Sequence, residues 1–214
     1  MLAAKGGIRH KRRMVFDWTA LLLYLLAALA LLGAPGSVPL ALAAAGRRVG
    51  WRGTLPFFLG VEIGLGIGAA LTAAGIMTAL IAVPSIKLGL MIVAVAYLLY
   101  LAWRTAFAPI GRLAAGDFAL NPLSGVIVGI ANPKGFAAFA AIMAGFTIVP
   151  DMALWDGVVK WIGVMAVVIA VDIVWIAIGI LIGSVDLSPR HERMINIGFG
   201  IAIVATAIFA FVTA

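Results

Sequence analysis

The sequence predicts an all-α integral membrane protein in which six transmembrane helices form two inverted three-helix repeats, with helices 1 and 4 broken at proline-containing motifs. Three observations lead to this prediction. Hydrophobic residues make up 65% of the 214 residues and charged residues only 11%, whereas soluble domains carry about 25% charged residues. Apolar runs long enough to cross a hydrocarbon core of about 30 Å recur along the whole chain. The two halves also repeat the same order of features.

Charged residues delimit the six predicted spans. These spans are residues 18–46, 54–82, 85–107, 121–149, 161–185 and 194–214. The first and fourth are about 29 residues long, which exceeds a straight crossing at about 1.5 Å per residue. Pro35-Gly36 interrupts the first span and Asn132-Pro133-Lys134-Gly135 interrupts the fourth. We expect both helices to break there, because proline lacks a backbone donor and disfavours helix in the preceding residue.

The second and fifth spans each hold one acid in the same setting, Val61-Glu62-Ile63 and Val171-Asp172-Ile173. Each half therefore contains a broken helix, an acid-bearing helix and a plain helix. Because three is an odd number, a tandem repeat places the second half upside down. Paired breaks in an inverted repeat point to a binding site near the midplane. The expected organisation is a basic cytoplasmic tail (1–17), a first repeat (18–110), a connecting loop (111–120) and a second repeat (121–214).

The net charge of +7 is concentrated at the start of the chain. Five of the fifteen basic residues are Lys5, Arg9, Lys11, Arg12 and Arg13. A basic segment before an apolar helix indicates a cytoplasmic anchor facing anionic lipid rather than a nucleic-acid site. We therefore expect a multi-pass protein of the inner (plasma) membrane with its N-terminus inside, although the basic residues of the remaining loops do not settle the orientation. A cleavable signal is the alternative, but the apolar stretch runs on to Gly46, too long for a signal core.

Several classes of chemistry are disfavoured by the residue content. The chain has no cysteine, which excludes disulfides and thiolate metal clusters. The two histidines, His10 and His191, lie in predicted loops and cannot share a helix face. We expect no metal site and no cofactor. An enzyme is also not expected, because no nucleophile–base pair or phosphate loop is evident.

Glu62 and Asp172 are the candidate proton carriers. A carboxylate inside a membrane span is costly unless it is paired, hydrated or protonated, so such residues usually mark pathways or proton relays. The alternative is structural, since buried carboxyl groups also lock helices together by hydrogen bonding.

The two breaks supply the candidate substrate-binding residues, which are Pro35, Gly36, Ser37, Asn132, Pro133 and Lys134. A half-helix that restarts after a break presents free N–H groups and a positive dipole end, which suits a carboxylate. Ser37 and Asn132 can add hydrogen bonds, and Lys134 can pair with a substrate carboxylate, with Glu62 or with Asp172. The alternatives are a simple kink and a lysine that reaches the membrane surface.

The glycines Gly60, Gly64 and Gly68 recur every four residues near Glu62. Small residues at this spacing allow helices to approach closely in membranes. We expect this stripe to pack against another helix.

Several short motifs occur in a defined order along the chain. They are Pro35-Gly36, the run from Gly46 to Gly53, Leu59-Gly60 with Gly64, the run from Ala96 to Leu101, Asn132-Pro133-Lys134 and the run from Arg193 to Gly200. Together they make the chain resemble the lysine exporter superfamily, the LysE/RhtB type of amino-acid efflux proteins. The resemblance implies a six-helix, or five-plus-re-entrant, exporter of amino acids or close derivatives driven by the proton gradient.

Two departures from the family pattern affect the substrate. Members usually carry Pro-Gly-Pro in the first span, whereas here Ser37 and Val38 precede Pro39. Some exporters of basic amino acids have a second acid shortly after Asn-Pro, where this chain has Ala138. Asp172 is a candidate substitute from the fifth span. These departures weaken the case for transferring a substrate from those relatives to this chain.

The sequence hypothesis is an exporter, monomeric or homodimeric, whose partners are an amino-acid-like substrate, protons and the lipid bilayer. In it, Lys134 and the half-helix amides hold the substrate carboxylate. Two alternatives stay open. One is an inorganic cation transporter with Glu62, Asp172 and Asn132 as oxygen ligands, against which the charge of Lys134 argues. The other is a membrane scaffold without transport activity.

Overall fold

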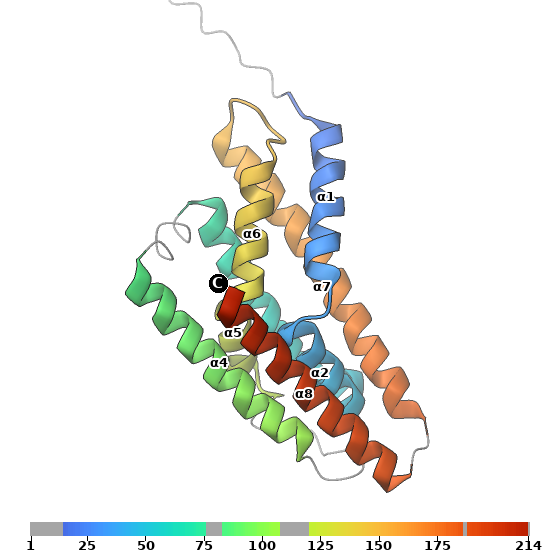
Figure 1. The fold of residues 1–214 in the computed structure, drawn as a ribbon. Helices are drawn as coiled ribbons and strands as arrows, with labels where there is room; N and C mark the ends of the chain where they lie inside the picture. The colour runs from blue at the N-terminus through green and yellow to red at the C-terminus, as the bar shows by residue number, and fades with distance from the viewer. Residues whose placement is uncertain (1–14, 76–82, 108–119, 186–187, 214) are drawn as a thin grey trace, which may run out of the picture.

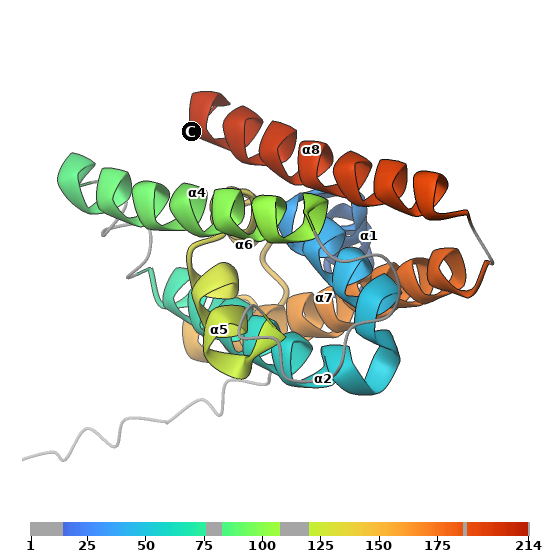
Figure 2. The same ribbon diagram turned by 90° about the horizontal axis from the view of Figure 1, so that it is seen from below.

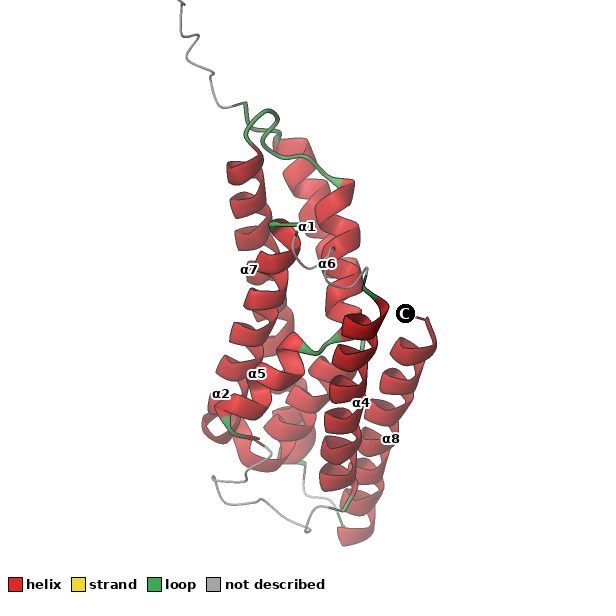
Figure 3. Cartoon of the chain, turned by 90° about the vertical axis from the view of Figure 1, so that its left-hand side faces the viewer, coloured by secondary structure: helices red, strands yellow, loops and turns green. Residues whose placement is uncertain are grey.

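The structure is a computed structural model that describes residues 15–75, 83–107, 120–185 and 188–213. Within these ranges the chain forms seven helices and no strand (Figures 1 and 3). The helices are α1 (Trp18–Gly33), α2 (Ser37–Ala73), α4 (Pro84–Ala106), α5 (Pro122–Ile130), α6 (Pro133–Gly145), α7 (Ala153–Ser184) and α8 (Pro189–Thr213). The all-helical prediction is confirmed for this part. Nearly all of the basic tail and of the connecting loop lies outside the described residues.

The described helices include clear membrane spans. By length and composition, α2 and α7 can each cross a membrane, and the pair α5–α6, bent by 54°, qualifies as a third span. The chain is thus a helical membrane protein. The count of six spans and the inverted relation of the halves stay predictions.

Both proline-containing breaks interrupt helices as the sequence predicts. α1 ends at Gly33 and α2 begins at Ser37, while α5 ends at Ile130 and α6 begins at Pro133. Asp17 fixes the start of α1, because its side chain accepts a hydrogen bond from the amide of Ala20 at 2.9 Å. A side-chain acceptor of this kind satisfies one of the free amides of the first helical turn.

Three predicted loop segments are helical instead. The run from Arg47 to Gly53 continues α2 through a kink at Gly50, whose φ of 67° and ψ of −172° a side chain would strain. α7 begins at Ala153 rather than at residue 161, and α8 begins at Pro189 rather than at residue 194. The prediction was wrong there because charged residues were assigned to loops, whereas they occupy helical turns at the ends of apolar spans.

Each broken helix packs against the acid-bearing helix of the other half (Figure 1). α1 and the first segment of α2 (37–49) lie along α7, where a Cβ on Gly179 would come 1.9 Å from the carbonyl oxygen of Ala43. α5 lies along the second segment of α2 (51–73), where a Cβ on Gly60 would come 2.0 Å from the carbonyl oxygen of Pro122. The packing role predicted for the glycine stripe is confirmed.

α4 and α8 form a side-by-side pair on one side of this core (Figure 2). A polar contact joins the pair to the core, because the guanidinium of Arg47 at the kinked part of α2 donates a hydrogen bond to Oδ1 of Asn196 on α8. Asn196 is buried.

Candidate binding site

The first break is an extended segment between α1 and α2. Ala34 follows the last turn of α1 with φ −63° and ψ 145°, and Gly36 precedes α2 with φ −154° and ψ 178°. Glycine has no side chain to cap the first amides of α2, and no side-chain cap bond is formed. The start of α2 therefore offers backbone donors that its own N-cap residue leaves uncovered.

The second break places an asparagine at the start of α6. Asn132 is the N-cap residue, but its side chain makes no capping hydrogen bond, although asparagine commonly caps helices in this position. Its Oδ1 is buried without a hydrogen-bond partner in the described structure. Gly135 makes room for this side chain, since a Cβ there would come 2.9 Å from Nδ2 of Asn132. The side-chain oxygen of Asn132 is thus available to accept a hydrogen bond.

Lys134 joins the two breaks across about one hundred residues of sequence. Its ammonium donates hydrogen bonds to the carbonyl oxygens of Ala34 at 2.6 Å and Pro35 at 3.4 Å. A Cβ on Gly36 would come 3.0 Å from Cδ of Lys134, so the absence of a side chain there gives the lysine its place. Of the three partners considered for Lys134, the structure brings Asp172 near enough to attract the ammonium.

Glu62 and Asp172 face each other from α2 and α7. Their carboxyl groups interact with one another. Asp172 is only 2% exposed, and its Oδ2 has no hydrogen-bond partner among the described residues. Both carboxyl oxygens of Glu62 are also buried without a partner in this part of the chain. Two acids from different halves of the sequence thus share one buried position.

A cavity of about 30 Å³ lies between the breaks. Asn132, Lys134 and Asp172 supply its polar lining, together with apolar side chains. This volume corresponds to about one or two water molecules. A groove of about 860 Å³ between α4 and α8 is far larger, but its lining is apolar apart from Arg193. A site for a polar substrate needs convergent polar groups, so we place it at the breaks.

The predicted residues fall into two groups. Asn132, Lys134 and Asp172 line the cavity. Gly36 and the carbonyl of Pro35 lie against Lys134, and Glu62 contacts Asp172. Ser37 is buried at the start of α2 but does not line the cavity, and Pro133 serves as the first residue of α6. Sequence reasoning missed the apolar lining residues Leu32, Val38, Pro39, Leu65, Val168 and Val171.

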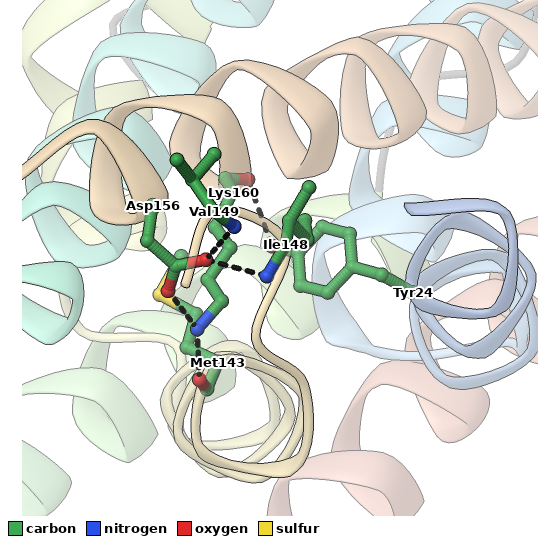
Figure 4. Close-up of polar contacts among 6 residues, drawn as sticks. All are labelled: Tyr24, Met143, Ile148, Val149, Asp156 and Lys160. Atoms are coloured by element: carbon green, nitrogen blue, oxygen red, sulfur yellow. Dashed lines mark hydrogen bonds and ion pairs between the residues drawn. The ribbon is translucent and has the colours of Figure 1, made fainter. Parts of the chain in front are cut away.

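A buried ion pair away from the breaks was also missed (Figure 4). Lys160 lies 2.6 Å from Asp156 and donates to the carbonyl of Met143 at the end of α6. Asp156 accepts from the amides of Ile148 and Val149, at 2.6 and 2.9 Å. The hydroxyl of Tyr24 on α1 donates to the carbonyl of Lys160 at 2.8 Å. The four-residue spacing of Asp156 and Lys160 was the available signal, but both residues were assigned to a loop.

Comparison with curated proteins and with solved structures gives no match. A family comparison does give one, and it covers residues 27–213, which include both breaks, both buried acids and α4 to α8. Over this range the chain matches the LysE type translocators. The chain therefore belongs to the LysE type translocator family, as the sequence resemblance predicts, and is a membrane transporter.

Proposed function

We propose that this transporter exports amino acids or close derivatives across the inner membrane, coupled to the proton gradient, with the two breaks framing its binding site. The observation that carries the proposal is that the two breaks meet, at a position that is only partly buried. There Lys134 of the second break binds the carbonyl end of the first, beside Asp172 and Asn132. Paired helix breaks with buried charges are the usual form of a substrate site in secondary transporters.

The chemistry of the site suits a zwitterion. The N-terminal ends of α2 and α6 carry positive dipole ends and no side-chain caps, so they favour a carboxylate. The buried acceptor oxygens of Glu62, Asp172 and Asn132 favour an ammonium group. In this proposal Pro35, Gly36 and Pro133 keep the helices interrupted at the two breaks. Ser37 lies at the N-terminal end of α2, where the free amides are.

The acids provide a route for coupling. Burial makes an unpaired carboxylate costly, so each acid is stabilised by a proton or by a cationic partner. We propose that Glu62 and Asp172 exchange protons for the substrate ammonium. The 30 Å³ cavity is too small for an amino acid, so substrate entry requires the breaks to move apart. Protonation then biases the transporter between inward and outward opening.

Counterflow in proteoliposomes tests the substrate class. Vesicles are preloaded with unlabelled amino acids or metal ions, and accumulation of the labelled compound is recorded with and without a pH gradient. Accumulation of one amino-acid class that responds to the gradient is the expected result. Cation uptake without amino-acid uptake would instead favour the inorganic cation transporter.

The double variant Glu62→Gln, Asp172→Asn tests the coupling. Both substitutions keep the side-chain size and remove the titratable proton, so we expect counterflow to persist while the response to the pH gradient is lost. Gradient-driven accumulation should fall at least about tenfold, the scale expected for a lost proton-transfer group. Asp151→Asn is the matched control, because Asp151 is exposed outside the site. A full gradient response in the double variant would refute the proton-carrier roles.

A further inference from the structure

The site has an excess of buried acceptors over donors. Four oxygen atoms lack a hydrogen-bond partner within the described residues: both carboxyl oxygens of Glu62, Oδ2 of Asp172 and Oδ1 of Asn132. Asp172 and Asn132 are at least nine-tenths buried, and both line the cavity. Because a buried acceptor without a donor is costly, these atoms favour a ligand that brings N–H groups.

The charges around the cavity leave room for one more cation. Two carboxyl groups, Glu62 and Asp172, share the position, whereas Lys134 is the single basic residue in the described lining of the cavity. With both acids ionised the balance is therefore one negative charge. A substrate also brings a carboxylate, which the positive ends of α2 and α6 offset. Its one ammonium group then balances the remaining negative charge, whereas a second would leave an excess positive charge.

Lys134 already occupies a partly exposed position that binds its ammonium group. Two backbone carbonyls accept its hydrogen bonds, from Ala34 and Pro35. They lie just beyond the last turn of α1, where the helix dipole is negative and favours a cation. Gly36 borders this position, where an added Cβ would come 3.0 Å from Cδ and 3.2 Å from Nζ of Lys134. The Lys134 ammonium therefore occupies a position into which the ammonium group of a ligand would fit.

We infer that Lys134 determines substrate specificity by occupying, as a built-in ligand, the position that the second ammonium group of a basic substrate would take. The inference rests on the proposed function. The transporter accordingly accepts substrates with one ammonium group, such as neutral amino acids. It excludes substrates with two, such as lysine, ornithine and short diamines. Removal of the Lys134 charge opens the second position and reverses this exclusion.

Counterflow of neutral and basic amino acids in wild type, Lys134→Met and Lys134→Gln tests the inference. Methionine keeps much of the volume of the lysine side chain without its charge, and glutamine also keeps a hydrogen-bond donor. We expect the ratio of basic to neutral transport to rise at least about tenfold in both variants, the scale of one hydrogen bond to a charged group. Lys134→Arg keeps the charge and should keep the exclusion. Arg190→Met is a second control, because it removes an exposed basic residue at the start of α8, outside the site.

The outcomes separate this inference from the proposed function. Transport of no amino acid by the wild type would refute the proposed function itself. Equal transport of lysine and neutral amino acids by the wild type would overturn the inference alone, even if no variant can be purified. Loss of neutral transport in the Met and Gln variants with no gain for basic substrates would also overturn it. A gain for basic substrates in the Arg variant would do the same, because the charge is retained there.

Discussion

Gly179→Ala should destabilise the protein strongly, because it places a methyl group where two helices touch. The new Cβ would lie 1.9 Å from the carbonyl oxygen of Ala43, which is far inside van der Waals contact. The obstacle is backbone, so no side-chain rotation relieves the clash and α2 must move away from α7. Overpacking of a close interface costs about 1–3 kcal/mol, and this site belongs at the upper end. Thermal unfolding in detergent, followed by tryptophan fluorescence, measures the effect.

Gly198→Ala is the matched control for this prediction. Gly198 lies inside α8, and a Cβ there meets nothing within 4 Å. Alanine favours helix over glycine by up to about 1 kcal/mol, so the control should be neutral or slightly stabilising. Equal melting temperatures for Gly179→Ala and the wild type would contradict the close approach of α2 and α7.

Lys160→Met should have the second large effect on stability. Lys160 is 7% exposed and forms an ion pair with Asp156 and a hydrogen bond with Met143. Its loss leaves the partly buried carboxylate of Asp156 without its cation and a carbonyl at the end of α6 without its donor. Breaking one partner of a buried ion pair costs about 3–5 kcal/mol. We expect a cost near 3 kcal/mol, because Asp156 keeps two backbone donors. Unfolding in detergent measures this cost.

The double variant Asp156→Asn, Lys160→Met provides the control for the ion pair. Asparagine keeps one oxygen for the amides of Ile148 and Val149 but carries no charge. The double variant should therefore be less damaged than the sum of the two single variants, by the coupling energy between the charges. Strict additivity of the two single effects would show that the pair contributes nothing beyond its separate hydrogen bonds.

Local chemistry made much of the architecture predictable. Proline removes a backbone donor and disfavours helix in the preceding residue, which made the breaks at Pro35 and Pro133 predictable, although Pro56 lies within α2 without ending it. The four-residue spacing of Gly60 and Gly64 likewise indicates a close helix contact without knowledge of the partner. The convergence of Asp172, Asn132 and Lys134 on one cavity was suggested by the repetition of features between the halves.

The features that sequence reasoning missed depend on contacts between distant segments. Asp156 and Lys160 stand at the end of an apolar run, where charges normally meet water. Their partners, the amides of Ile148 and Val149 and the carbonyl of Met143, come from other segments of the chain. The hydrogen-bond partners of the Lys134 ammonium could not be predicted either, because these carbonyl oxygens lie about one hundred residues away in sequence. The kink at Gly50 was read as a loop because a helix with one left-handed residue has no distinct sequence pattern.

Each half of the chain packs against helices of the other half, and this affects the insertion of the protein into the membrane during synthesis. During synthesis, α2 leaves the ribosome before α5 and α7 have been made. Asp172 follows Glu62 by 110 residues in the sequence. At about 5–20 residues per second this delay lasts about 5–20 seconds. During that time Glu62 lacks its neighbouring acid and the glycine face of α2 has no helix against it. Insertion of the first half therefore depends on lipid or the insertion machinery to shield these groups until synthesis of the second half completes the fold.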